Sequence, residues 1–414
     1  METTAVILAG GRGTRSANPG LPKIAQEVGG KTLLQWHFDL LRASHINNVV
    51  LVTGHLADQV DQLVASSNAD GLQVTTLQER EPQGTVQAVR EALTATYASH
   101  LLVILGDVWC SFPVNDFLLG WQRDNRSVAA IVHPSLHPAD SDAVIPHPDG
   151  NVEVIPKGQR VGLHRNMSAA GVFGVTREFL LPGDTPKDIG SDLLREAAVS
   201  NELLAFVSSH YFKDTGTPDR LESAQRDWES GAFTRRGELG PRPALILDRD
   251  GVINPALPEV YRADQLELIP GVAHQITRAN ALGVPVVVAT NQPGLAKGFM
   301  EVEHHEQIRA RLDQLLIDQG AFIDDYAYCP HHSESGHQGE VAELKIQCDC
   351  RKPEPGLLLE LIARHGLDAA ASVMVGDSDR DLEAATSAEA GFIRVDGELP
   401  SPAAIAEAVD RLTC

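Results

Sequence analysis

The chain has 414 residues, more than one hydrophobic core usually organises, because single cores stop growing at roughly 250 to 300 residues. Its residues are 43% hydrophobic and 22% charged, as in globular proteins and unlike disordered chains. Asp and Glu number 56 against 34 Lys and Arg, a formal net charge of -22, which argues against nucleic acid and anionic membrane surfaces as partners. We therefore expect two globular domains, and small phosphate-bearing substrates remain compatible with this charge because a few Lys and Arg in a cleft set the local field.

The chain shows no pattern of a membrane span or a secretion signal. The apolar run Val284 to Ala289 is far shorter than the roughly 18 residues that a span needs. No basic region precedes the first apolar stretch, which ends in glycines. Three of the five cysteines lie in one segment, residues 329 to 350, a spacing that suits a metal site in a reducing compartment. We expect a cytoplasmic protein, and the sequence leaves open whether it forms a homo-oligomer.

Short apolar runs alternate with amphipathic stretches twice along the chain, which is the pattern of a parallel sheet covered on both faces. The predicted strands are Ala5 to Leu8, Val49 to Thr53, Leu72 to Leu77 and Leu101 to Leu105 in the first half, and Ala244 to Leu247, Val284 to Ala289 and Val373 to Val375 in the second. Residues 234 to 243 between them mix charge, glycine and proline, as linkers do. We predict two α/β domains, at residues 1–233 and 244–414.

A glycine-rich loop follows the first predicted strand. Glycines there let backbone N–H groups approach a phosphate chain, although the same loop can also be a tight turn between a strand and a helix. The residues that we expect to contact a nucleotide are Leu8, Gly10, Gly11, Gly13 and Thr14. Arg15 and Lys23 follow and add positive charge.

The order of this loop, the Leu21-Pro22-Lys23 segment and later motifs resembles sugar-phosphate nucleotidyltransferases over about residues 4 to 228. The resemblance implies a Rossmann-like, GT-A-like fold. It also implies that Gly84 and Thr85 contact the nucleobase, that Gly171 contacts the sugar and that Lys157 contacts the sugar phosphate. Asp107 and Asp214 are the implied Mg2+ ligands. In that family the sugar phosphate attacks the nucleotide and pyrophosphate leaves, so cations must neutralise the charge that develops. The resemblance assigns this task to Arg15, Lys23 and Mg2+.

Some residues of this half leave alternatives open. An aspartate directly after a strand, such as Asp107, can instead be the N-cap of a helix. Gln83 and Pro156 depart from the family's usual residues beside the nucleobase loop and beside Lys157. These departures leave the base preference open.

Asp248 and Asp250 follow the first strand of the second half. A carboxylate can attack phosphorus and form an aspartyl phosphate, and a second carboxylate two positions on points to the same side of an extended chain. The pair is followed in order by Thr290, the Arg351-Lys352-Pro353 segment, and Gly376-Asp377. This set resembles the four motifs of the haloacid dehalogenase (HAD) phosphatases.

The resemblance to HAD phosphatases implies a Rossmannoid fold and a set of roles. Asp248 is the expected nucleophile and Asp250 the expected acid and base. Thr290 and Lys352 are expected to hold and neutralise the phosphoryl group. Substrate contacts are expected for Asn291, Gln292 and Arg351. The expected Mg2+ ligands are Asp248, Asp377 and the backbone carbonyl of Asp250. Asp381 is expected to support the site.

A Cys-Pro-His-His segment and a Cys-Asp-Cys segment bracket a polar loop in the second half. Three thiolates and one imidazole make a closed tetrahedral zinc site, with a surface disulfide as the alternative. The expected ligands are Cys329, His331, Cys348 and Cys350, with His332 as the less favoured histidine. Such a zinc loop, together with the Thr290 to Gly298 motif, resembles heptose 1,7-bisphosphate 7-phosphatases. Histidinol-phosphate phosphatases share this pattern, and Ser378 departs from the basic residue that commonly stands there.

The two resemblances fit one function, because removing the 7-phosphate of a heptose 1,7-bisphosphate yields a heptose 1-phosphate that a nucleotidyltransferase can use. Among relatives, the first half looks most like heptose-1-phosphate guanylyltransferases, which favours GTP as the nucleoside triphosphate and GDP-heptose as the product. One alternative is a mannose-1-phosphate or glucose-1-phosphate nucleotidyltransferase fused to a histidinol-phosphate-type phosphatase. A second alternative is one active enzyme fused to a regulatory binding module.

Overall fold

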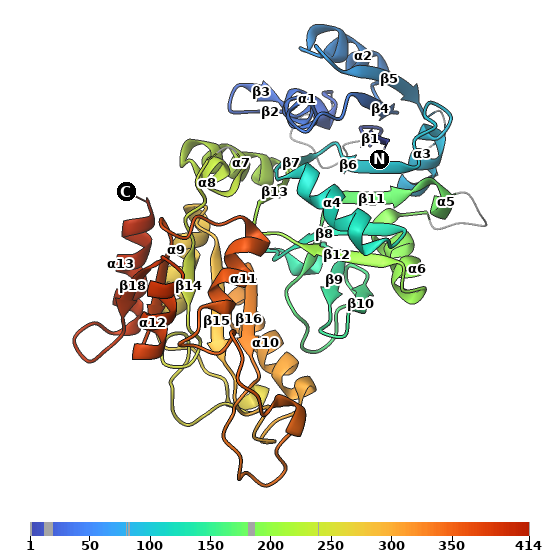
Figure 1. Cartoon of the computed structure of the whole chain (residues 1–414). Coiled ribbons are helices and arrows are strands. Elements are labelled where there is room, and N and C mark those ends of the chain that lie inside the picture. Colours follow the sequence, from blue (N-terminus) through green and yellow to red (C-terminus); the bar gives the residue numbers. More distant parts are fainter. Residues whose placement is uncertain are drawn as a thin grey trace. The chain divides into compact units, whose positions relative to one another are not determined.

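The structure is a computed structural model that describes residues 2–11, 20–79, 81, 83–180, 187–238 and 240–413 (Figure 1). It contains two compact units, which are described separately. The first comprises residues 1–133, 137–160 and 167–230, and the second comprises 134–136, 161–166 and 231–414. Within the described residues, no helix is long and apolar enough to cross a membrane.

The first unit is built on a nine-stranded sheet in which β10, β9, β11, β6, β1, β4 and β5 are neighbours in that order, and β8 joins β11 to β12. The strands of this sheet are β1 (Thr3–Leu8), β4 (Asn48–Thr53), β5 (Gln73–Gln78), β6 (His100–Leu105), β8 (Val128–His133), β9 (Ala143–Pro146), β10 (Val152–Ile155), β11 (Ser168–Thr176) and β12 (Leu203–Val207). Two small ribbons, β2 (Glu27–Val28) with β3 (Lys31–Thr32) and β7 (Val108–Ser111) with β13 (Tyr211–Asp214), lie outside it.

The helices of the first unit are α1 (Leu33–Ala43), α2 (Ala57–Ser66), α3 (Thr85–Ala92), α4 (Val114–Asp124), α5 (Arg177–Leu180), α6 (Leu194–Val199) and α7 (Pro218–Glu229). Four strands, β5, β4, β1 and β6, are parallel, as the sequence predicted. The prediction of a parallel sheet is wrong beyond β6, where β11 pairs antiparallel with both β6 and β8. A strand can pair antiparallel with a strand of an otherwise parallel sheet. Its pattern of apolar residues is the same for either direction of the chain, so the sequence does not reveal the direction.

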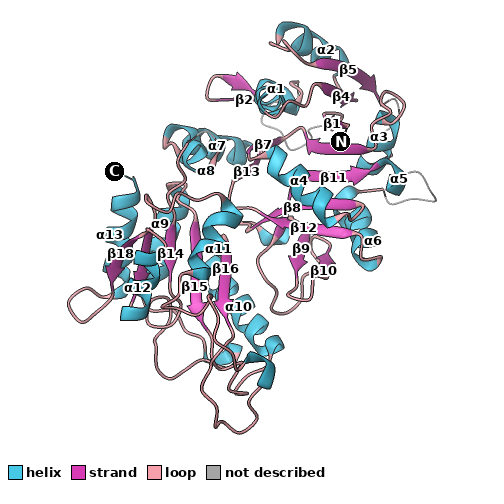
Figure 2. Cartoon of the chain, in the orientation of Figure 1, coloured by secondary structure: helices cyan, strands magenta, loops and turns pink. Residues whose placement is uncertain are grey.

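The second unit has a fully parallel sheet with the strand order β16, β15, β14, β17, β18 (Figure 2). Its strands are β14 (Leu245–Leu247), β15 (Val286–Asn291), β16 (Asp325–Cys329), β17 (Val373–Gly376) and β18 (Gly391–Arg394), and its helices are α8 (Ala232–Arg236), α9 (Val272–Ala281), α10 (Val302–Ile317), α11 (Gly356–His365), α12 (Asp379–Ser387) and α13 (Ser401–Thr413). The chain leaves β14 on one side for β15 and later returns to its other side as β17. Open α/β sheets bind ligands at such a reversal, beyond the carboxyl ends of the strands.

Alternate residues of the central strands pack on opposite faces of this sheet, because side-chain direction alternates along a strand. Leu245 and Leu247 belong to the buried cluster that includes residues of α9, α10 and α13. Ile246 belongs to the cluster that includes residues of α11 and α12. Helices on both faces leave the strand ends free to carry a site.

The expected linker is partly helical. Residues 232 to 236 form α8, which belongs to the second compact unit. Arg236 is buried, and its NH1 lies 2.6 Å from Oδ1 of Asp324, another buried residue. A buried ion pair holds this helix against the unit, although its sequence looks like a solvated segment.

Candidate active sites

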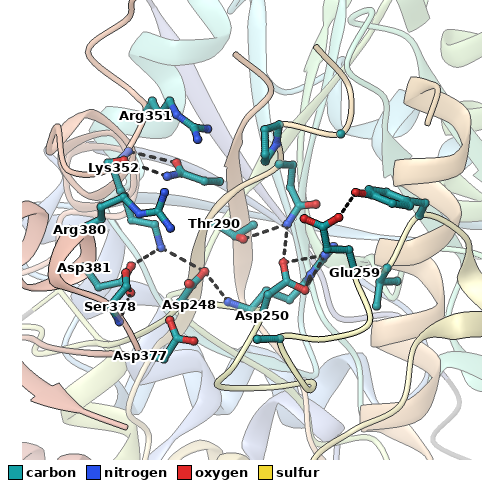
Figure 3. Close-up of a pocket in the computed structure, with 18 residues that line it drawn as sticks. Asp248, Asp250, Glu259, Thr290, Arg351, Lys352, Asp377, Ser378, Arg380 and Asp381 are labelled. Atoms are coloured by element: carbon teal, nitrogen blue, oxygen red, sulfur yellow. Dashed lines mark hydrogen bonds and ion pairs between the residues drawn. The ribbon is translucent and has the colours of Figure 1, made fainter. Parts of the chain in front are cut away.

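The motifs of the second half converge at the carboxyl edge of the parallel sheet. Asp248 directly follows β14, Thr290 and Asn291 end β15, and Asp377 directly follows β17. Parallel register brings these strand ends to one edge. They line one cavity of about 220 Å³ together with Asp250 and Lys352, and Figure 3 shows these side chains around it.

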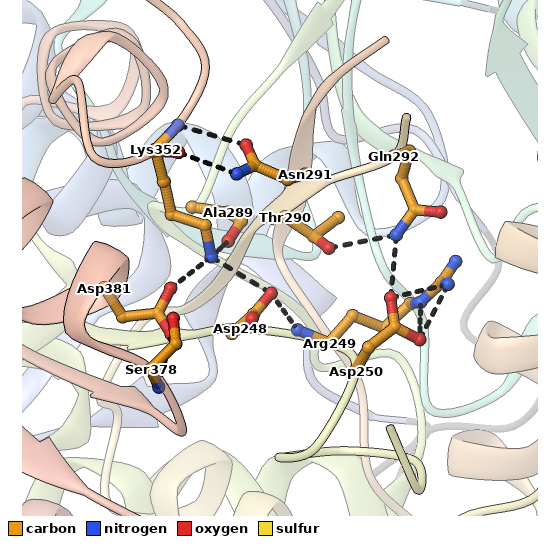
Figure 4. Close-up of polar contacts among 10 residues, drawn as sticks. All are labelled: Asp248, Arg249, Asp250, Ala289, Thr290, Asn291, Gln292, Lys352, Ser378 and Asp381. Carbon is orange, nitrogen blue, oxygen red and sulfur yellow. Dashed lines mark hydrogen bonds and ion pairs between the residues drawn. The ribbon is translucent and has the colours of Figure 1, made fainter. Parts of the chain in front are cut away.

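Lys352 lies between two buried carboxylates at the base of this cavity. Its Nζ is 3.1 Å from Oδ1 of Asp248 and 2.6 Å from Oδ1 of Asp381, and it donates to the carbonyl of Ala289 at 2.8 Å (Figure 4). Burial opposes the charge of Lys352, but the two carboxylates outweigh it and raise the pKa of the amine. One cation is therefore shared by two anions.

Burial raises the pKa of Asp248 to about 6, with Lys352 opposing the shift and the carboxylates of Asp381 and Asp250 adding to it. A carboxylate with a raised pKa is a stronger nucleophile than an ordinary one while it remains ionised near neutral pH. The backbone N–H of Arg249 donates to Asp248 Oδ1 at 2.7 Å and fixes that oxygen.

Asp250 is held by three donors. Arg249 NH2 donates to both of its oxygens at 2.8 Å, Asn254 Nδ2 donates to Oδ1 at 2.9 Å, and Gln292 Nε2 donates to Oδ2 at 2.9 Å (Figure 4). Burial opposes ionisation of Asp250, but these donors outweigh it and lower its pKa. The sequence analysis did not identify Arg249, which is fully buried between the two motif aspartates.

The segment that carries Lys352 is joined to the end of β15. Asn291 Nδ2 donates to the carbonyl of Lys352 at 2.9 Å, and the N–H of Lys352 donates to Asn291 Oδ1 at 3.0 Å. Gln292 donates to Thr290 Oγ1 at 3.0 Å as well as to Asp250. These paired contacts fix the positions of both the lysine and the threonine relative to Asp248.

Asp377 approaches the backbone of the first motif closely. Gly251 has φ +87, and a Cβ there would lie 2.1 Å from Asp377 Oδ2, so only glycine fits. Asp381 accepts from the N–H and hydroxyl of Ser378 at 3.1 and 2.7 Å and caps α12. Carboxylate oxygens of Asp248, Asp377 and Asp381 lie within 4.8 Å of one another, a donor set that could hold a divalent cation.

The four expected zinc ligands come together. One ligand atom from each of Cys329, His331, Cys348 and Cys350 lies within 4.8 Å of the others, and Cys348 Sγ is 3.6 Å from Cys329 Sγ and 3.3 Å from Cys350 Sγ. These separations far exceed a disulfide bond of about 2.05 Å and approach the roughly 3.8 Å edge of a tetrahedral zinc–thiolate site. The ring of His332 does not join this group, and its Nδ1 contacts the carbonyl of Glu334 at 3.4 Å.

The cavity also has lining residues that the sequence analysis did not single out, namely Arg249, Glu259, Tyr261 and Arg380. Tyr261 donates its hydroxyl to Glu259. These residues stand outside the motif positions, and no spacing rule in the sequence marks them. Together with the motif residues, they determine which chemical groups surround a ligand in this cavity.

In the first unit, the turn after β1 is closely packed by two other strand ends. Gly106 N donates to the carbonyl of Leu8 at 2.9 Å, and a Cβ on Gly54 would lie 2.7 Å from the carbonyl of Gly10. Gly11 has nothing within 4 Å of its Cβ position. The expected nucleotide-binding residues Gly13, Thr14 and Arg15 lie outside the described residues.

Lys23, Asp107 and Asp214 converge on one point. Lys23 Nζ is 2.6 Å from Asp107 Oδ2. An ideal Cβ on Gly216 would lie 2.9 Å from Asp214 Oδ1, 3.0 Å from Asp107 Oδ2 and 3.0 Å from Lys23 Nζ. The pairing of β7 with β13 places Asp214 opposite Val108, and Arg220 forms an ion pair with Asp214. The arrangement can bind a cation and, through Lys23, a phosphate.

The other predicted contacts of the first unit occupy separate elements. Gly84 is the N-cap of α3, with φ +108, and Thr85 Oγ1 accepts from Ile189 N at 2.8 Å. Gly171 has φ +80 at an irregularity of β11, beside Val108. Lys157 is exposed in the turn after β10. In the described part of the chain, no hydrogen bond or ion pair joins Lys157 to Lys23, Asp107 or Asp214.

Two family models match the chain. A MobA-like NTP transferase domain matches residues 5–148, and a HAD-hydrolase-like model matches residues 349–413. The D-glycero-beta-D-manno-heptose-1,7-bisphosphate 7-phosphatase of Escherichia coli K12 is 41% identical over 149 residues, which are 36% of this chain and 76% of that protein.

Solved structures are similar to each half. The D,D-heptose 1.7-bisphosphate phosphatase of B. bronchiseptica complexed with magnesium and phosphate is 34% identical and has a TM-score of 0.32, covering 36% of this chain and 78% of that chain. HddC from Yersinia pseudotuberculosis complexed with GMP-PN is 24% identical with a TM-score of 0.47, covering 54% of this chain and 99% of that chain.

Proposed function

The chain belongs, through its C-terminal part, to the D-glycero-beta-D-manno-heptose-1,7-bisphosphate 7-phosphatase family, and from this premise we propose that it catalyses two consecutive steps of nucleotide-activated heptose synthesis. The phosphatase unit removes the 7-phosphate of heptose 1,7-bisphosphate. The NTP transferase unit then joins heptose 1-phosphate to a nucleotidyl group, GMP from GTP, and releases pyrophosphate. The observation that carries the proposal is the joining of a MobA-like NTP transferase domain to this phosphatase in one chain.

In the phosphatase step, Asp248 attacks the phosphorus of the 7-phosphate, and the bond from phosphorus to the heptose oxygen breaks. Lys352 neutralises the charge of Asp248 and of the phosphoryl group, and Thr290 donates to a phosphoryl oxygen. Asp250 gives a proton to the departing heptose oxygen and then takes one from the water that releases phosphate from Asp248. The lowered pKa of Asp250 suits its second task, and an approaching anionic phosphate raises that pKa for the first.

We assign a Mg2+ site to Asp248, the carbonyl of Asp250 and Asp377. The convergence of carboxylate oxygens from Asp248 and Asp377 fits an oxygen-preferring cation. When bound there, such an ion would supply positive charge between the anionic nucleophile and the anionic phosphate. Asp381 has another task, because its contacts with Lys352 and Ser378 engage both of its oxygens.

We assign structural Zn2+ to Cys329, His331, Cys348 and Cys350, because three thiols and one imidazole nitrogen at these separations suit a closed tetrahedral site. Cys350 directly precedes Arg351 and Lys352 in the chain. Arg351 NH1 donates to the carbonyl of His331 at 3.1 Å. The cluster therefore holds the segment that delivers Lys352 to the cavity.

In the transferase unit, we assign Mg2+ to Asp107 and Asp214, whose carboxylates converge beside Gly216. Lys23 and Arg15 neutralise phosphate charge, and the backbone around Gly10, Gly11 and Gly13 contacts the nucleotide with Leu8 and Thr14. Gly84 and Thr85 contact the base, and Gly171 and Lys157 contact the sugar phosphate. These roles follow the resemblance of this half to sugar-phosphate nucleotidyltransferases.

Dephosphorylation comes first in the proposed order. A heptose 1,7-bisphosphate would bring roughly two further negative charges into a transferase site that already faces a triphosphate. The phosphatase cavity instead offers Lys352 and Arg351 to the 7-phosphate, and the assigned Mg2+ would add further positive charge. Heptose 1-phosphate is therefore the species that passes to the transferase, in the cytoplasm as we propose.

The proposal is tested by incubating the purified chain with heptose 1,7-bisphosphate, Mg2+ and each of the four nucleoside triphosphates, and identifying products by mass. We expect inorganic phosphate, pyrophosphate and GDP-heptose, with GTP as the best donor. Turnover of histidinol phosphate in preference to the heptose bisphosphate would support the alternative phosphatase. Use of mannose 1-phosphate in preference to heptose 1-phosphate would support the alternative transferase.

A further inference from the structure

Arg249 links Asp250 to a second layer of residues behind the phosphatase cavity. Its NH2 donates to both oxygens of Asp250 at 2.8 Å, and its Nε donates to Oδ1 at 3.2 Å (Figure 4). Two N–H groups of a planar guanidinium on one carboxylate fix the plane of that carboxylate. Arg249 is buried, yet within the described residues its NH1 makes no hydrogen bond of ordinary geometry. Buried donors are nearly always paired in folded proteins, so this atom indicates a further contact of Arg249.

The hydroxyl of Tyr326 is placed to accept that contact. Tyr326 in β16 lies opposite Val288 of β15, which lies opposite Leu247 of β14, so these side chains share one face of the sheet. Arg249 comes two positions after Leu247, a spacing that directs it to the same face while the chain stays extended. The Tyr326 side chain is buried, and in the described part of the chain its Oη also lacks a hydrogen bond of ordinary geometry. Burial raises the pKa of Tyr326 to about 12 and the charge of Arg249 opposes this rise, which indicates that the guanidinium is close to the phenol.

Two residues of α10 hold the ring of Tyr326 in place. Arg309 Cζ lies 4.8 Å from the centroid of this ring, and the centroid of the His305 ring is 5.8 Å away. His305 is itself fully buried, and its ring centroid lies 4.0 Å from that of Tyr328. Closely packed side chains of this kind keep one orientation. The Tyr326 hydroxyl is therefore held in one position on this face of the sheet.

We propose that Tyr326 is a positioning residue of the phosphatase reaction. Its hydroxyl accepts a hydrogen bond from Arg249 NH1, and Arg249 in turn holds the carboxylate of Asp250 in the orientation that delivers a proton to the departing heptose oxygen. Tyr326 does not line the cavity, so it acts on the reaction only through Arg249. The inference rests on the proposed function, in which Asp250 is the acid and base.

The test compares two phosphate esters whose leaving groups differ in their need for a proton. A heptose alkoxide is strongly basic and leaves only when it is protonated, whereas p-nitrophenolate leaves without a proton. Tyr326→Phe in the full chain removes only the hydroxyl. It should lower kcat/KM for heptose 1,7-bisphosphate about 10-fold, a part of the roughly 100- to 10,000-fold that a positioned acid contributes. The value for p-nitrophenyl phosphate should change less than about threefold, because its departure does not depend on that acid.

Tyr328→Phe is the matched control. Tyr328 lies two residues further along β16, and loss of its hydroxyl should leave both values of kcat/KM unchanged. A merely structural role of Tyr326 would lower both values together, because a loosened fold does not distinguish between leaving groups. Denaturant unfolding of each variant measures the stability separately.

A double-mutant cycle tests whether Tyr326 acts through Arg249. Arg249→Lys keeps the charge but loses the planar fork that holds Asp250. Without that fork the Tyr326 hydroxyl has no guanidinium to position. Adding Tyr326→Phe to Arg249→Lys should therefore lower kcat/KM for heptose 1,7-bisphosphate less than about twofold further, since the two residues form one network.

The possible failures are distinguishable. Equal losses on both esters, no loss on either, the same leaving-group effect in Tyr328→Phe, or independent effects in the cycle would each show that the inference is wrong while the proposed function stands. If the wild-type chain hydrolyses histidinol phosphate but not heptose 1,7-bisphosphate, the proposed function is wrong. The same comparison is then made with histidinol phosphate, whose alcohol also leaves with a proton. Hydrolysis of p-nitrophenyl phosphate alone would refute both the proposed function and the inference.

Discussion

Lys352 Nζ lies 3.1 Å from Oδ1 of Asp248, and both side chains are almost completely buried. The same amine is 2.6 Å from Asp381, so the proposed nucleophile shares this buried lysine with a carboxylate that caps α12. This relationship ties the reactivity of the phosphatase site to the stability of the unit that carries it.

Lys352→Met should abolish phosphate release and destabilise the second unit by about 3 to 5 kcal/mol, because it leaves two buried carboxylates without their cation. Denaturant unfolding measures the stability. The double variant Lys352→Met with Asp381→Asn removes one of those unpaired charges and should recover part of the stability but none of the activity. A double variant that is no more stable than Lys352→Met would contradict this explanation.

Cys348→Ser should lose one zinc per chain and weaken the phosphatase much more than the transferase, because the segment bearing Lys352 is released. Metal analysis and the two assays, run on one preparation, check this. Cys110→Ala is the matched control, since Cys110 is a buried cysteine of β7 outside the cluster, and it should keep its zinc. A fully active zinc-free phosphatase would refute the assignment.

Gly216→Ala should reduce nucleotidyl transfer by about 100-fold, in line with the cost of a displacement of about 1 Å in an active site. The new Cβ would lie about 3 Å from Asp107, Asp214 and Lys23. Phosphate release by the other unit should be unchanged. Gly397→Ala, at a position with nothing within 4 Å of the Cβ, should leave both activities intact. Normal transfer by Gly216→Ala would show that these side chains do not form the site.

Asp325 provides a prediction about pH. Burial opposes its ionisation, but His365 Nε2 at 2.9 Å and Arg364 NH1 at 2.6 Å outweigh it and hold its pKa far below the ordinary value. Its stabilising effect is therefore complete above the unfolded pKa of about 3.9 and declines as the pH falls below it. Asp325→Asn should cost roughly 2 to 3 kcal/mol at pH 7 and progressively less below pH 4, measured by thermal unfolding. A cost that is independent of pH would rule out an effect of charge.

The motif residues of the phosphatase could be predicted from the sequence because chemistry and topology coincide there. Asp248, Thr290 and Asp377 each stand at the end of an apolar run, and parallel strands bring such ends to one edge. The cluster that we propose to bind zinc could be predicted because its Cys-x-His and Cys-x-Cys pairs are visible in the sequence itself. In the first half, β1, β4, β5 and β6 follow from their apolar runs for the same reason.

Other features depend on partners that are distant in the sequence. Arg249 stands between the two motif aspartates, and the sequence does not show that its side chain donates hydrogen bonds to Asp250. That contact is visible only in the folded structure. The sequence around Arg236 has the pattern of a charged linker, because its ion-pair partner, Asp324, is 88 residues away in the chain. The antiparallel direction of β11 leaves no trace in its apolar pattern. Arg380 belongs to no motif, and its place in the lining of the cavity depends on segments far away in the sequence.

The central claim, two separate active sites acting in sequence, is tested most directly by following products over time from heptose 1,7-bisphosphate, GTP and Mg2+. The wild-type chain should accumulate heptose 1-phosphate before GDP-heptose and pyrophosphate appear. Asp248→Asn should form no GDP-heptose unless heptose 1-phosphate is supplied, because an amide is a poor nucleophile, and Asp107→Ala should stop at heptose 1-phosphate. Loss of both activities in either folded variant, or a GDP-heptose that still carries its 7-phosphate, would contradict the account.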